Sequence, residues 1–118
     1  MLNVGVNQTL AVYEGNYGMI QKSGIERNTM IAAMKEVMKI AEHEKVILTE
    51  VDLEYWLKIL NTLSPDGKPS MRQDAEARRH SEVELFAGTV IQFGKKYGVN
   101  TPVNQRLYDK IVEMEKTY

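Results

Sequence analysis

The sequence contains no cysteine and only two histidines, and these absences exclude several kinds of site. Without thiols there can be no disulfide, no cysteine nucleophile and no cysteine-bound zinc, and a cytoplasmic location is the default expectation. His43 and His80 lie far apart in the sequence and do not form the HExxH spacing of helical zinc sites. We therefore expect no metal site in this chain.

An excess of charge of one sign is also lacking, since 15 basic and 16 acidic residues give a net charge of -1. Such a balance leaves no electrostatic footprint for nucleic acid or an anionic membrane surface. No apolar run approaches the roughly 20 residues that span a bilayer, and the N-terminus lacks the pattern of a signal peptide. We expect no nucleic-acid or membrane partner, and 118 residues fit one globular domain.

Strictly alternating apolar residues are scarce, whereas apolar residues three and four positions apart recur along nearly the whole chain. The pattern predicts an all-α domain, a compact bundle of about six helices without a sheet. The first helix is expected from Leu2 to about Tyr13, followed by a turn at 14–18 that contains two glycines and an asparagine. Ser23 has capping-box spacing for a long second helix. We expect its inner face to consist of Met30, Met34, Val37, Met38 and Ala41.

The remaining helices are expected to begin at hydroxyl residues that favour helix starts. Thr49 precedes a helix that buries the only tryptophan, and 64–69, with two prolines and a glycine, ends it. The other expected helices are a short one from Ser70 to about Arg78, one from Ser81 to Tyr97 before Gly98, and a last one after Thr101-Pro102.

Four polar residues are candidates for a site. Asn3 and Asn7 are four apart and project from one helical face, where an amide serves either an interhelical hydrogen bond or a ligand. Ser70 and Glu82 each stand where a helix begins. Ser70 can serve as an N-cap and Glu82 can complement the helix dipole. Alternatively, Ser70 could bind an anion and Glu82 a cation.

Taken in order, four segments resemble one family, ketopantoate reductase (2-dehydropantoate 2-reductase). They are Asn3-Val4-Gly5-Val6-Asn7, Ser70-Met71-Arg72-Gln73-Asp74, Ser81-Glu82 and Thr101-Pro102-Val103-Asn104. The resemblance covers nearly the whole chain and concerns the family's helical C-terminal domain, which is similar to that of 6-phosphogluconate dehydrogenase-like reductases.

The resemblance implies an NADPH-dependent oxidoreductase that reduces 2-dehydropantoate to pantoate, in pantothenate and coenzyme A biosynthesis. By that similarity Asn3, Asn7 and Ser70 bind the substrate. Glu82 is the catalytic glutamate, which holds the family's catalytic lysine. Residues 1–118 would form one domain for substrate binding and dimerisation, and a homodimer is a candidate assembly because apolar helix surface needs cover.

The sequence departs from the family at the lysine, whose position, one helical turn before Asn3, falls before Met1. No GxGxxG motif follows a strand, so we expect the N-terminal Rossmann domain that binds NADPH to be absent from this chain. The isolated chain is expected to bind no cofactor and to be inactive. Arg72 and Tyr17 also differ from common family residues.

Two alternatives stay open. Arg72 and Tyr17 could reshape the pocket for another branched 2-oxo acid, in a related reductase. The chain could instead be a stand-alone helical interaction module without chemistry. The residues upstream of Met1 would distinguish a truncated reductase from such a module.

Overall fold

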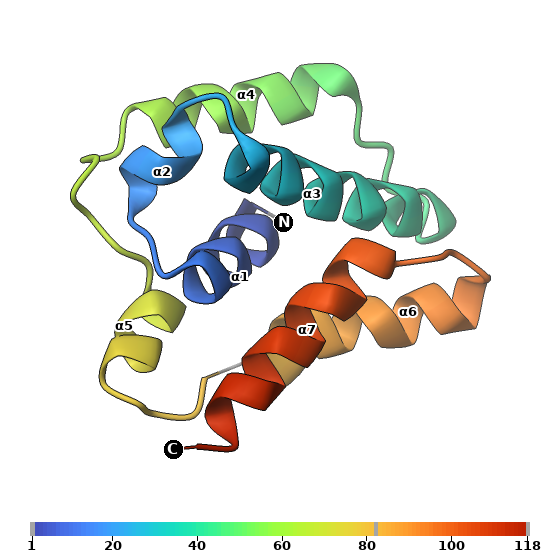
Figure 1. The fold of residues 1–118 in the computed structure, drawn as a ribbon. Coiled ribbons are helices and arrows are strands. Elements are labelled where there is room, and N and C mark those ends of the chain that lie inside the picture. Colours follow the sequence, from blue (N-terminus) through green and yellow to red (C-terminus); the bar gives the residue numbers. More distant parts are fainter. Residues whose placement is uncertain (1, 82, 118) are drawn as a thin grey trace.

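Helices account for all regular structure in the described part of the chain, in a computed structural model (Figure 1). The description covers the backbone of residues 2–81 and 83–117, and their side chains except those of residues 2–4, 70, 84 and 85. No strand occurs within these ranges, so the all-α prediction is confirmed. The elements are α1 (Leu2–Tyr13), α2 (Tyr17–Gln21), α3 (Ile25–His43), α4 (Glu50–Asn61), α5 (Ser70–Glu76), the π-helical turn η1 (Glu84–Gly88), α6 (Thr89–Tyr97) and α7 (Pro102–Glu115).

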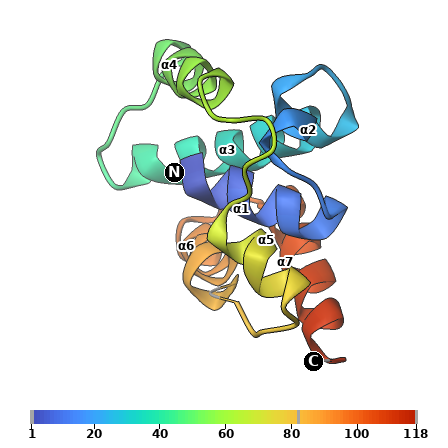
Figure 2. The same cartoon turned by 90° about the vertical axis from the view of Figure 1, so that its left-hand side faces the viewer.

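Helix α1 runs through the middle of the bundle and separates two apolar clusters (Figures 1 and 2). Burial on two sides explains why residues 5–11 of α1 are all buried. The first cluster joins α1 to α2, α3 and α4 through Val6, Leu10, Ile20, Met30, Met34, Leu53 and Leu60. The second joins α1 to α5, η1 and α7 through Ala11, Met71, Val83, Ala87 and Ile111.

Gly5 allows α1 to lie close against α3. A Cβ atom at this position would lie 2.7 Å from Cγ of Met34 and 3.0 Å from the carbonyl oxygen of Met30. Both methionines are fully buried, as the sequence predicted for the inner face of this helix. The close approach explains why glycine is tolerated inside α1 although it weakens an isolated helix.

Several local predictions were wrong. Residues Tyr17–Gln21 form the short helix α2, where we expected only the end of a turn, because Ile20 is fully buried in the first cluster and its packing favours a helix there. Gly24, not Ser23, is the N-cap of α3. Likewise Pro69 is the N-cap of α5, so Ser70 is the first residue of that helix, which ends at Glu76 rather than near Arg78.

The expected single helix from Ser81 to Tyr97 is interrupted by the π-helical turn η1 before α6 begins at Thr89. The hydroxyl of Ser81 donates to Glu115 at 2.9 Å. Gly98 ends α6 in a left-handed conformation (φ 69°), as predicted. The tryptophan, Trp56, is only half-buried, at the margin of the first cluster.

Helix α7 begins as predicted, with Thr101 at the N-cap and Pro102 at the first helical position. Its free backbone N–H groups, however, are bound by a carboxylate from α3. Glu36 accepts hydrogen bonds from the N–H of Val103 (2.8 Å) and the N–H of Asn104 (3.0 Å). The Asn104 amide adds a third bond to Glu36 at 2.7 Å. The packing of α3 against α7 thus supplies the cap.

Candidate functional site

Helix α1 carries the first two predicted site residues. Asn7 lies in its middle and is 7% exposed. An amide with this little exposure requires hydrogen-bond partners, either from the protein or from a ligand. The side chain of Asn3 lies outside the described residues, and its backbone position places it one helical turn before Asn7.

The third predicted residue, Ser70, opens α5, which packs against α1. The side chain of Ser70 lies outside the described residues. Its neighbour Met71 is 1% exposed and belongs to the same apolar cluster as Ala11 of α1. Buried contact between Met71 and α1 therefore fixes the start of α5 beside the helix that carries Asn7.

Arg72 also links α5 to the residue that follows α1. Its guanidinium donates to the backbone oxygen of Glu14, at the end of α1, at 3.4 Å, and lies 3.3 Å from the carboxylate of Glu76. Lys68 also bonds Glu76, and this hydrogen bond is the main reason why the pKa of Glu76 is lowered. The positive charges of Lys68 and Arg72 are therefore both bound to acceptors of the protein itself.

Glu82, the predicted catalytic residue, lies outside the described residues, but both of its neighbours are described. Ser81 is hydrogen-bonded to Glu115 of α7, and Val83 is 4% exposed within the second apolar cluster. The π-helical turn η1 begins at Glu84 and contacts α1. π-helical turns of this kind often accompany functional sites.

Two elements close to predicted residues in the sequence, α5 and η1, thus meet at α1, the helix that carries Asn3 and Asn7. Helix α5 and η1 both pack against α1 although they are far from it in the sequence. The side chains of Asn3, Ser70 and Glu82 lie outside the described residues, so the assignment of the four-residue site stays a prediction.

Tyr17, one of the departures from the family pattern, takes a packing role. Its ring lies against the first apolar cluster and against Gly67, where a Cβ atom would come within 2.9 Å of Tyr17 Cδ2. The N–H of Tyr17 donates to the backbone oxygen of Gly67 at 2.9 Å. These contacts tie α2 to the loop that leads into α5.

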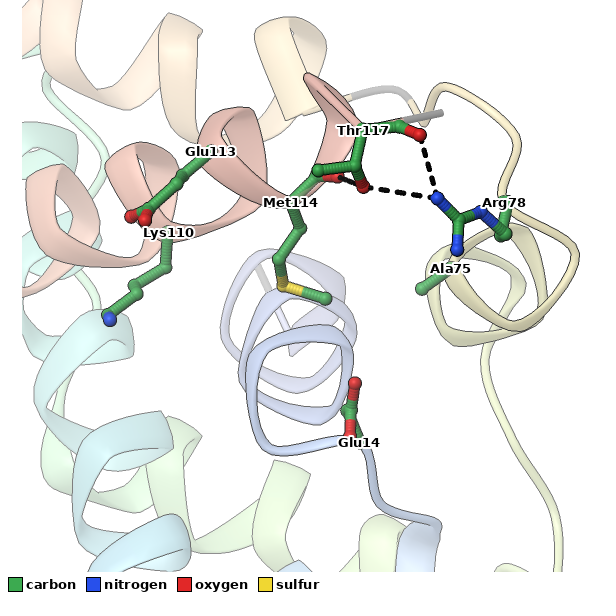
Figure 3. A pocket seen from close by; sticks show the side chains of 7 residues that line it. All are labelled: Glu14, Ala75, Arg78, Lys110, Glu113, Met114 and Thr117. Atoms are coloured by element: carbon green, nitrogen blue, oxygen red, sulfur yellow. Dashed lines mark hydrogen bonds between the residues drawn. The ribbon is translucent and has the colours of Figure 1, made fainter.

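A depression of about 460 Å³ lies between α1, α5 and α7 and contains none of the predicted site residues (Figure 3). Charges of both signs line it, because Arg78 and Lys110 face it together with Glu14 and Glu113. Figure 3 shows the Arg78 guanidinium bonded to Thr117, at 2.7 Å from its backbone oxygen. This mixture does not define an anion site.

Two buried carboxylates were missed by sequence reasoning. Glu36 and Glu115 are each 8% exposed. A signal was present, since Glu115 continues the inward row of Leu107 and Ile111 at four-residue spacing, and Glu36 follows the buried Ala33 three positions on. A glutamate on an apolar stripe indicates a buried carboxylate that requires donors.

The described residues contain neither a membrane-spanning helix nor a cluster of metal ligands. No helix there is both long and apolar enough to cross a membrane. No group of three or more His, Asp or Glu side chains in the same residues is arranged to hold a metal ion.

Comparison with known proteins identifies the class of this domain. Residues 1–115 match the family model described as ketopantoate reductase PanE/ApbA C terminal. The helical bundle is therefore the C-terminal domain type of a reductase. The chain belongs to the ketopantoate reductase C-terminal family, and the resemblance inferred from its motifs is confirmed.

Individual relatives agree with this assignment. The 2-dehydropantoate 2-reductase of Salmonella typhimurium is 26% identical over 117 residues, which cover 99% of this chain and 38% of the relative. A dimeric ketopantoate reductase from Staphylococcus aureus has a TM-score of 0.89 at 16% identity, over 98% of this chain and 40% of its own. A D-mandelate dehydrogenase solved with NADH and anilino(oxo)acetate has a TM-score of 0.86 at 24% identity, over 98% and 49% respectively. The chain thus spans less than half the length of these proteins.

Proposed function

We propose that this chain is the substrate-binding half of an NADPH-dependent 2-dehydropantoate 2-reductase, which converts ketopantoate to pantoate on the route to pantothenate and coenzyme A. The observation that carries the proposal is the family match over residues 1–115, which includes all four predicted site residues. The arrangement of α5 and η1 around α1 supports it, because α5 begins at Ser70 and η1 begins two residues after Glu82.

The nucleotide belongs to another domain in this proposal. The described residues contain no strand, and the sequence has no GxGxxG motif, so these residues do not fit a dinucleotide bound in Rossmann fashion. A nucleotide-binding domain of the same enzyme is the proposed partner, and the site lies in the cleft between the two domains. We also propose that this enzyme is cytoplasmic.

The chain's own residues would bind and orient the substrate. The amides of Asn3 and Asn7 hydrogen-bond its hydroxyl, and Ser70 contacts its carboxylate. Reduction of a ketone builds negative charge on the carbonyl oxygen, which a nearby ammonium can stabilise and protonate. Glu82 holds that ammonium, the family's lysine, through a charge-assisted hydrogen bond.

A homodimer is the proposed assembly. Val51 and Tyr55 lie one turn apart on α4, Ile47 lies in the loop before it, and all three are 62% to 73% exposed. Exposed apolar rows favour association. The name of the Staphylococcus aureus relative as a dimeric ketopantoate reductase is consistent with this assembly.

A second candidate is a related reductase of another branched 2-oxo acid. The name of the D-mandelate dehydrogenase that shares this fold supports it, and Arg72 is the departure from the family pattern that motivates it.

Substitution of Glu82 tests the site assignment. In the complete reductase, Glu82→Gln removes the charge that orients the ammonium, so we expect kcat to fall about 10- to 100-fold with little change in thermal midpoint. Glu113→Gln, an exposed glutamate on α7, is the control. Unchanged turnover in Glu82→Gln would reject the catalytic role.

A further inference from the structure

The loop between α5 and η1 is fastened by the C-terminal end of α7. Arg78 of this loop donates to the backbone oxygen of Thr117 at 2.7 Å and to its hydroxyl at 3.3 Å (Figure 3). Arg78 has a positive φ of 55°, a conformation that costs a non-glycine residue free energy and persists where surrounding contacts hold it. The bonds to Thr117 are such contacts.

Glu115 makes the strongest of these attachments. Its Oε1 accepts the Ser81 N–H at 2.9 Å, and its Oε2 accepts the Ser81 hydroxyl at 2.9 Å. The Nδ1 atom of His80 lies 3.2 Å from the same Oε1. Both carboxylate oxygens are therefore occupied by one short stretch of loop.

Burial of a carboxylate is costly unless hydrogen bonds compensate for the lost water. Glu115 is 8% exposed and continues the inward row of α7, where an apolar residue would pack without that cost. At this position Glu115 accepts two hydrogen bonds from Ser81. Ser81 immediately precedes Glu82, and on the other side Val83 is buried against the second apolar cluster.

We propose that Glu115 is a positioning residue for Glu82. It fixes the backbone N–H and hydroxyl of Ser81, the residue before Glu82, while Val83, the residue after it, is buried in the second apolar cluster. This inference rests on the proposed role of Glu82 and adds to it a residue on the last helix that touches neither substrate nor cofactor. The activity that depends on Glu82 would then also depend on α7.

A double-mutant cycle in the complete reductase tests the inference. We expect Glu115→Gln to lower kcat about tenfold, the loss expected from one charge-assisted hydrogen bond, with little change in KM. In the Glu82→Gln background the same substitution should lower kcat less than twofold, because Glu115 acts through Glu82. A purely structural role would reduce kcat by the same factor in both backgrounds.

Two further comparisons control for folding. Glu113→Gln removes the same charge from the same helix at an exposed position and should leave kcat unchanged. Ser81→Ala should lower kcat several-fold and Ser81→Thr should restore it, since threonine keeps the hydroxyl. If Glu115→Gln does not fold, this serine pair, measured with and without Glu82→Gln, decides the question.

The outcomes separate the two proposals. Equal losses in both backgrounds, or no loss in either, would overturn the positioning role while leaving Glu82 catalytic. No effect of Glu82→Gln alone would reject the proposed site and the positioning role with it. Loss confined to the background with an intact Glu82 supports both.

Discussion

Removal of the Glu36 carboxylate should destabilise the domain more than any surface substitution on α3. Three donors converge on this side chain from the start of α7, at 2.7 to 3.0 Å. Two of them are backbone N–H groups that have no partner within their own helix. A carboxylate there also complements the positive end of the α7 dipole.

The magnitude follows from what each variant leaves behind. Glu36→Ala leaves three donors without their acceptor, and Asn104 is fully buried, so we expect a loss of about 3–5 kcal/mol in the free energy of unfolding. Glu36→Gln keeps one oxygen, which can still serve Asn104, but turns an NH₂ group toward the Val103 N–H. Its expected cost is about 1.5–3 kcal/mol.

Urea unfolding followed by circular dichroism measures these differences. The total stability of such a domain is about 5–15 kcal/mol, so the Glu36→Ala midpoint should fall well below that of the unsubstituted chain. Glu42→Ala, at an exposed position of the same helix, is the matched control and should change stability by less than about 0.5 kcal/mol. Equal midpoints for Glu36→Ala and Glu42→Ala would refute the capping role of Glu36.

Two further predictions concern packing and pH. Gly5→Ala should cost about 1–3 kcal/mol in urea unfolding, because the new methyl group would meet the Met30 carbonyl oxygen and Met34 Cγ, and an unchanged midpoint would contradict the close approach of α1 and α3. The hydrogen bond from Lys68 lowers the pKa of Glu76 below its usual 4.5, so the ionised carboxylate contributes stability above that value and loses it as the pH falls through the lowered pKa. Glu76→Gln should therefore be slightly less stable than the unsubstituted chain at neutral pH, with the difference shrinking on acidification and in high salt, whereas a difference independent of pH would contradict the ion pair.

The all-helical fold and the order of the main helices could be predicted, because apolar residues recur at helical spacing and Thr49 and Thr101 mark the starts of α4 and α7. Thr101-Pro102 and Gly98 marked the start of α7 and the end of α6 correctly, since cap and turn preferences are local. The short helix α2 could not be predicted, because the packing of Ile20 and not the local sequence stabilises it. Long-range contacts override weak local preferences there.

The site shows the same division between local and long-range information. The family motifs predict four site residues, and the fold packs α5, which begins at Ser70, against α1, which carries Asn3 and Asn7. Glu36 and Glu115 escaped prediction because their donors come from segments 67 and 34 residues away in the sequence. A buried carboxylate can be suspected from an apolar stripe, but its partners emerge only from the fold.

Substrate turnover by the complete reductase tests the central proposal most directly. NADPH oxidation should be followed with 2-dehydropantoate and with a panel of other branched and aromatic 2-oxo acids, and the isolated 118-residue chain serves as the control without activity. We predict the highest kcat/KM for 2-dehydropantoate. A higher kcat/KM for another 2-oxo acid, or no NADPH oxidation with any of them, would contradict it.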